Sequence, residues 1–63
     1  MFEIVYPEDR EKYANDEFHS VEDCKDFISN LRGSWEEIKA FGNDLGAFLD
    51  NSTGVIVVIQ EAA

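Results

Sequence analysis

The chain has 63 residues, with 14 Asp and Glu against 5 Lys and Arg, and a formal net charge of -9 at pH 7. A charge this negative repels nucleic-acid phosphates and anionic membrane surfaces, which excludes both as direct ligands. A domain of this size buries only about 60% of the surface that its unfolded chain exposes, so it has little room for an enclosed catalytic pocket. We therefore expect one domain over residues 1–63, not an enzyme, that acts through its outer surface.

The composition also indicates a folded protein in a reducing compartment. Apolar residues make up 44% of the chain, which is too many for a disordered acidic tail. Cys24 has no second cysteine to pair with, so a cytoplasmic location fits best. The opening MFEIVYPEDR lacks the features of an export signal, and the longest apolar run, residues 55–59, is too short to span a bilayer.

The first predicted element is a strand over residues 2–6, FEIVY, where β-branched and aromatic residues dominate. Pro7 ends this strand because proline has no backbone N–H to donate. Residues 8–18 are polar with isolated aromatic residues. Their pattern leaves three alternatives open: a helical turn, a loop, or a second strand paired to the first.

The clearest predicted element is a helix over residues 20–32. Ser20 followed by Asp23 is a variant of the capping box, in which the hydroxyl accepts a backbone N–H at the helix start. Gly33 stands where a left-handed residue commonly ends a helix. The apolar residues recur at helical spacing on one face: Val21, Cys24, Phe27, Ile28 and Leu31.

A second helical segment is predicted over residues 35–50, broken near residue 42. The apolar residues continue at helical spacing: Trp35, Ile38, Phe41, Leu45, Phe48 and Leu49. Gly42 and Gly46 each weaken a helix by about 1 kcal/mol relative to alanine. We therefore expect a helix over residues 35–41 and a short helix over 44–50, with an extended hairpin through this region as the open alternative.

The last predicted element is a strand over residues 54–60. It follows the turn-like sequence NSTG and contains VIVVI, an apolar run typical of a strand that is covered on both faces. Helices between two strands favour a parallel pairing through a right-handed crossover. The predicted fold class is therefore α/β, with two helices packed on a small sheet that contains the strands at 2–6 and 54–60.

No catalytic or metal-binding constellation stands out. His19 and Ser20 are neighbours, but a catalytic pair also needs an orienting third group, and Ser20 is already explained as a helix cap. Cys24 lies on the apolar stripe, as a buried small hydrophobic residue does. There is no Cys/His cluster or calcium loop, so we predict no metal and no cofactor.

The acidic residues could serve either solubility or recognition. They are densest from residue 8 to 26, and Glu8, Asp9 and Glu11 stand close to Tyr6 and Tyr13. Carboxylates beside tyrosines suit contacts with Arg and Lys, which combine charge and stacking. A solvated flank is the equally open alternative.

Residues 41–50, FGNDLGAFLD, resemble the inhibitory segment of barstar-like ribonuclease inhibitors, in which such a stretch enters a helix. The matching positions are Phe41, Gly42, Leu45, Ala47 and Asp50. The resemblance implies that Asp50 is the principal acidic contact with a nuclease and that Gly42 lies in the contact loop. It places Asp44 where the family usually has Asn.

These observations predict a non-enzymatic acidic inhibitor, or nucleic-acid mimic, that blocks the basic site of a nuclease or other nucleic-acid-binding protein. Antitoxins, immunity proteins and phage proteins that disable host nucleases or CRISPR effectors are the settings that suit it. The predicted contact residues are Glu8, Asp9, Glu11, Tyr13, Gly42, Asp44 and Asp50. The competing hypothesis is a small interaction module that acts through an apolar patch as a homodimer, with its charge serving solubility.

Overall fold

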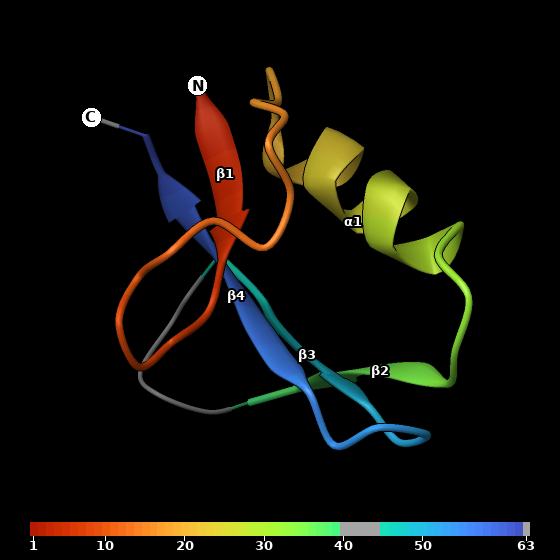
Figure 1. Ribbon diagram of the computed structural model, residues 1–63. Helices are drawn as coiled ribbons and strands as arrows, with labels where there is room; N and C mark the ends of the chain where they lie inside the picture. Colours follow the sequence, from red (N-terminus) through yellow and green to blue (C-terminus); the bar gives the residue numbers. More distant parts are fainter. Residues whose placement is uncertain (40–44, 63) are drawn as a thin grey trace.

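A computed structural model describes residues 1–39 and 45–62. In this part of the chain, one helix packs beside a four-stranded antiparallel sheet with the strand order β1-β4-β3-β2 (Figure 1). The elements in chain order are β1 (Phe2–Val5), α1 (Val21–Ser29), β2 (Trp35–Ile38), β3 (Ala47–Asp50) and β4 (Ile56–Glu61).

The prediction of a second helix over residues 35–50 is wrong. Its two ends form β2 and β3, which pair in antiparallel register from Trp35 opposite Asp50 to Ile38 opposite Ala47. This is the extended hairpin that the sequence left open. Trp35 and Ile38 of β2 are three residues apart, which also fits one face of a helix. β3 is buried on both faces, and such a strand lacks the simple alternation of polar and apolar residues that would identify it.

The predicted α/β class with parallel strands is also wrong. β1 and β4 overlap the ranges predicted as strands, but they pair antiparallel, with Phe2 opposite Glu61 and Val5 opposite Val58. The parallel pairing assumed that a helix precedes the last strand. The chain instead enters β4 from β3 through a tight turn over residues 51–55, and a short turn joins antiparallel neighbours.

Helix α1 lies within the range predicted for the first helix and begins as expected. The Ser20 hydroxyl accepts the backbone N–H of Asp23 at 3.1 Å. The helix ends at Ser29, earlier than predicted, because Asn30 turns back onto the last turn and its side-chain amide donates to the carbonyl of Asp26 at 2.9 Å. Asn competes with the helical backbone in this way.

The core lies on both faces of the sheet. Between α1 and the sheet, the buried cluster consists of Ile4, Cys24, Ile28, Phe48, Val57 and Ile59. The opposite face buries Val5, Ala47 and Val58, with Ile38 packed against them. Burial of each large aliphatic side chain contributes about 1.5–3 kcal/mol, so β4, buried on both faces, is the main source of core stability.

The segment after β1 runs back along the outer edge of that strand. Phe2 and Phe18 exchange two backbone hydrogen bonds of 2.7 and 2.8 Å, and Val5 forms a bridge with Lys12. Of the three alternatives for residues 8–18, the structure is thus a loop with isolated strand-like bridges. The segment covers the β1 edge of the sheet, while no described strand pairs with the outer side of β2.

Candidate functional site

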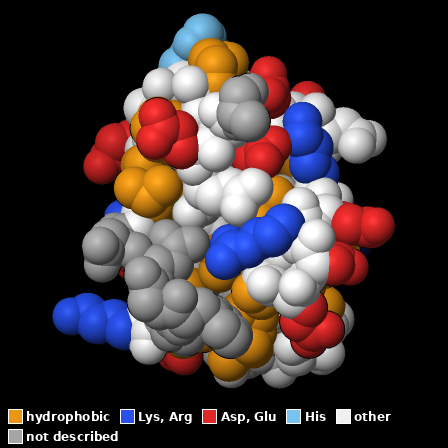
Figure 2. Space-filling model, turned by 90° about the vertical axis from the view of Figure 1, so that its left-hand side faces the viewer, with side chains coloured by type: hydrophobic (Ala, Val, Ile, Leu, Met, Phe, Trp, Pro, Cys, Tyr) orange, Lys and Arg blue, Asp and Glu red, His pale blue; other side chains and the backbone are white. Residues whose placement is uncertain are grey.

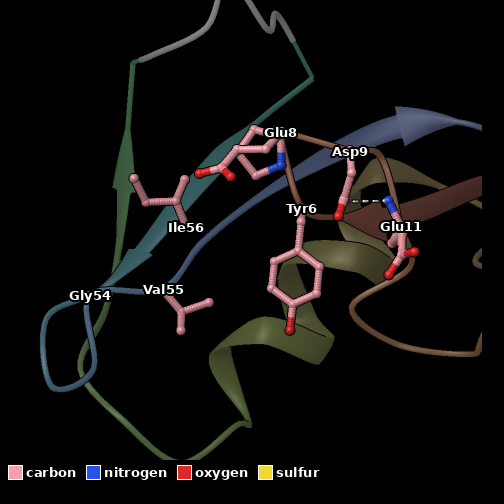
Figure 3. Close-up of a pocket in the computed structure, with 8 residues that line it drawn as sticks. Tyr6, Glu8, Asp9, Glu11, Gly54, Val55 and Ile56 are labelled. Carbon is pink, nitrogen blue, oxygen red and sulfur yellow. Dashed lines mark hydrogen bonds between the residues drawn. The ribbon is translucent and has the colours of Figure 1, made fainter.

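A pocket of about 450 Å³ opens between the turn after β1 and the start of β4. Tyr6, Glu8 and Glu11 line it from the turn, and Val55 and Ile56 line it from the other side (Figure 3). Asp9 belongs to the same lining. The structure therefore brings the three predicted contact carboxylates of residues 8–11 to one apolar-walled pocket.

Backbone hydrogen bonds fix the shape of this turn. The N–H of Tyr6 donates to the carbonyl of Glu11 at 2.9 Å, and the N–H of Arg10 donates to the carbonyl of Tyr6 at 3.0 Å. Arg10 has a φ of 61°, the left-handed conformation that closes the turn. Asp9 Oδ1 accepts the N–H of Glu11 at 3.0 Å, so this carboxylate both orders the turn and lines the pocket (Figure 3).

The carboxylates of the pocket have no basic side chain to neutralise them within the described residues. The nearest cations in the sequence point elsewhere. Lys12 Nζ lies 3.5 Å from Glu3 and 3.9 Å from Glu17, and Arg10 donates to the side chain of Gln60 at 3.3 Å. Negative charge is not limited to this pocket, since Figure 2 shows Asp and Glu side chains at several separate places on the face that it draws.

A row of aromatic rings runs from Tyr6, in the pocket lining, to Trp35 in β2. Tyr13 contacts Tyr6 edge to face, with ring centroids 5.6 Å apart, and contacts Trp35 in the same way at 5.8 Å. Tyr6 is 38% exposed, whereas Tyr13 is half-buried against the core. Tyr13, a predicted contact residue, therefore positions Tyr6, and Tyr6 is the tyrosine that meets solvent.

Asp50 is placed quite differently from the other predicted contact residues. Its side chain is buried, with only 5% of the residue exposed. It accepts hydrogen bonds from the Ser52 hydroxyl at 2.6 Å, from the backbone N–H groups of Ser34 and Ser52 at 3.0 Å each, and from the Thr53 hydroxyl at 3.0 Å. These bonds, that of the Ser52 hydroxyl first, lower the pKa of Asp50 to about 2. Asp50 thus joins the start of β2 to the β3–β4 turn.

The two remaining predicted contact residues, Gly42 and Asp44, lie outside the described residues. The sequence does not reveal the far wall of the pocket, formed by Val55 and Ile56, because both lie within the predicted strand over residues 54–60. The sequence predicts the turn NSTG at residues 51–54, but it does not show that the residues after this turn lie across from residues 6–11.

The Ser20 hydroxyl and the Cys24 thiol, two candidate reactive groups in the sequence, both have structural roles. The Ser20 oxygen caps α1, and Cys24 is fully buried, where burial raises the pKa of its thiol above the ordinary value. Among residues 1–39 and 45–62, no group of three or more His, Cys, Asp or Glu side chains is arranged to hold a metal ion. In the same ranges no helix has the length and apolar character needed to cross a membrane.

Comparisons with protein-family models, with curated proteins and with solved structures give no significant match to this chain. The resemblance of residues 41–50 to barstar-like inhibitors therefore stays a prediction. In the structure Ala47–Asp50 is strand β3, where the resemblance implies the start of a helix.

Proposed function

We propose that this protein is a non-enzymatic acidic inhibitor that binds and blocks the basic site of a nuclease or other nucleic-acid-binding protein. The observation that carries the proposal is the pocket of Tyr6, Glu8, Asp9 and Glu11, whose carboxylates form no ion pair among the described residues. An antitoxin, an immunity protein or a phage protein that disables a host nuclease or CRISPR effector would use such a surface.

An arginine or lysine side chain of the partner suits this pocket chemically. Its aliphatic stem packs against Val55 and Ile56, and its charged end meets the carboxylates of Glu8 and Glu11. The exposed ring of Tyr6 adds a cation–π contact, which is worth about 0.5–1 kcal/mol at an exposed site. The net charge of -9 accelerates the approach of a basic partner over a longer range.

The competing homodimer would need an exposed apolar patch. Among the described residues, the large hydrophobic side chains that are exposed are Met1 at 51% and Tyr6 at 38%. Tyr6 belongs to the acidic pocket, so the described surface favours the electrostatic proposal over an apolar one.

The test is a binding measurement with the partner that the protein captures from its native host or from phage-infected cells. The variant Glu8→Gln/Asp9→Asn/Glu11→Gln removes three pocket charges, and its matched control, Asp16→Asn/Asp26→Asn/Glu61→Gln, removes three exposed charges elsewhere. We expect the pocket variant to bind on the order of tenfold more weakly and the control to lose far less, with both effects shrinking in high salt. Equal losses would show that net charge alone matters, and an acidic partner would overturn the proposal.

A further inference from the structure

The two edges of the sheet differ in how they are covered. At one edge, the segment that returns after β1 hydrogen-bonds to that strand: Phe18 exchanges two backbone bonds with Phe2, and the N–H of Tyr13 donates to the carbonyl of Ile4 at 2.9 Å. At the other edge, β2 pairs with β3 and with no other described strand (Figure 1). An uncovered edge strand presents a row of unpaired N–H and C=O groups, which is a template for a further strand.

The register identifies which backbone groups face outward. Asn51 donates to the carbonyl of Ser34 at 3.0 Å, one step beyond the pair of Trp35 and Asp50. Since bonded and non-bonded pairs alternate in an antiparallel ladder, Glu36 and Ile38 bond to β3, while Trp35 and Glu37 direct their N–H and C=O groups away from it. No hydrogen bond of these outward backbone groups is formed with any other described residue.

The side chains of β2 indicate the charge of the strand that would pair there. Glu36 and Glu37 are both exposed and, as neighbours in a strand, project from opposite faces of the sheet. Glu37 Oε2 lies 3.4 Å from Lys25 Nζ of α1, and Glu36 forms no ion pair among the described residues. Opposite charges directly across two strands stabilise their pairing, and like charges destabilise it.

We propose that β2 binds an extended basic segment of a protein partner, which adds to the sheet as a fifth strand. Two adjacent Lys or Arg residues of that segment face Glu36 and Glu37, and its backbone bonds to the outward groups of Trp35 and Glu37. A second copy of this chain fits less well. When two β2 strands pair about a two-fold axis, the registers centred on Glu36 or Glu37 set like charges opposite each other, and the register centred on Ile38 sets Glu37 opposite Lys39 but supplies no cation for Glu36.

This surface is separate from the acidic pocket, and the proposal does not depend on the inhibitor function. The aromatic row nevertheless links the two, since Tyr6 contacts Tyr13 and Tyr13 contacts Trp35, the first residue of β2.

The first experiment uses a capped peptide with the sequence Thr-Val-Lys-Lys-Val-Thr and amide hydrogen exchange measured by NMR. In the free protein we expect fast exchange at the amides of Trp35 and Glu37 and slow exchange at those of Glu36 and Ile38. The peptide should slow Trp35 and Glu37 selectively. The same peptide with its central amide nitrogens methylated keeps the charge but loses the backbone donors, so it should give no such protection.

The second experiment separates the backbone from the charge within β2. Glu37→Pro removes an outward N–H without removing a bond to β3, which an edge strand tolerates. Glu37→Gln is the matched control, because it also loses the charge and the contact with Lys25 but keeps the N–H. We expect peptide affinity to fall at least about tenfold for the proline variant and about two- to fivefold for the glutamine variant.

Three results would overturn the proposal. Equal binding of the methylated peptide would mean that charge attraction alone is at work. Equal peptide affinities of folded Glu37→Pro and Glu37→Gln would likewise mean that charge attraction alone is at work. If the proline variant does not fold, the comparison of the methylated and unmethylated peptides with the wild-type protein tests the proposal instead. Slow exchange at Trp35 and Glu37 in the free protein, together with a dimeric mass, would mean that a second copy occupies the edge.

Discussion

The contact between Gly33 and Asp50 offers a sharp test of how β2 is held in place. Gly33 has a φ of 126°, a conformation that L-residues rarely adopt, and an added Cβ would lie 2.8 Å from each carboxylate oxygen of Asp50. Gly54 has a φ of 80°, but its Cβ would meet nothing within 4 Å. Alanine at these two positions therefore separates backbone strain from steric overlap.

The expected magnitudes follow from these two geometries. Gly54→Ala carries only the left-handed backbone cost, about 1 kcal/mol. Gly33→Ala carries about 1–3 kcal/mol of backbone strain, and the overlap with the carboxylate adds about 1–3 kcal/mol. For a domain of this size, 1 kcal/mol lowers Tm by about 4–8 °C. Gly54→Ala should therefore lower Tm by about 4–8 °C and Gly33→Ala by about 8 °C or more.

The assay is thermal unfolding followed by circular dichroism, with a double-mutant cycle as the control. Asp50→Ala removes the carboxylate that the new Cβ would meet, so in that background Gly33→Ala should cost only its backbone strain. Equal Tm losses for Gly33→Ala and Gly54→Ala would refute the reasoning. So would an unchanged cost of Gly33→Ala after Asp50 is truncated, because the overlap would then not be the cause.

Further predictions concern acid stability, the helix cap, the core and the buried thiol. Because the pKa of Asp50 is lowered to about 2 from 3.8, its contribution to stability is complete above pH 4 and is lost as the pH falls toward 2; acid titration of Asp50→Asn should show a weaker dependence over that window. Ser20→Ala should lower the free energy of unfolding by about 1 kcal/mol in urea titrations, and Ser20→Gly by less. Ile59→Ala, in the most deeply buried strand, should cost about 2–5 kcal/mol in the same assay, and a loss below 1 kcal/mol would contradict the described core. Cys24 should react with thiol reagents only at the rate at which the protein opens, so labelling as fast as in urea would place it outside the core.

Local signals in the sequence were read correctly where one neighbouring interaction decides the structure. Ser20 predicted its own bond to the Asp23 N–H, because a cap depends only on residues within one turn. The run VIVVI predicted a strand covered on both faces, and Val57, Val58 and Ile59 are fully buried. Both features are properties of a short segment.

The sequence did not predict the fold correctly where pairing between distant segments determines the secondary structure. WEEI has its apolar residues three apart, as a helix turn does, and only the pairing with β3 makes it a strand. That pairing depends on Asp50, which binds the Ser34 N–H across the hairpin. An acidic residue near a glycine-rich stretch looks like an exposed contact in the sequence, and its hydrogen bonds become visible only when β2 and β3 are brought together.

The sequence predicted one of the two walls of the candidate site. Glu8, Asp9 and Glu11 are adjacent in the chain, so their grouping needed no fold. The opposing wall of Val55 and Ile56 comes from the far end of the sequence, and its position requires both the β3–β4 turn and the antiparallel pairing of β1 with β4.

The place of β4 between β1 and β3 has a consequence for biosynthesis. β1 leaves the ribosome before the other strands, yet its partner β4 lies more than fifty residues further along the chain, as in the pair of Glu3 and Gln60. The hairpin of β2 and β3 emerges before the strand that joins it to β1. Until β4 has been translated, β1 and the hairpin of β2 and β3 cannot be joined in one sheet, so the sheet is completed late and through contacts between distant parts of the chain.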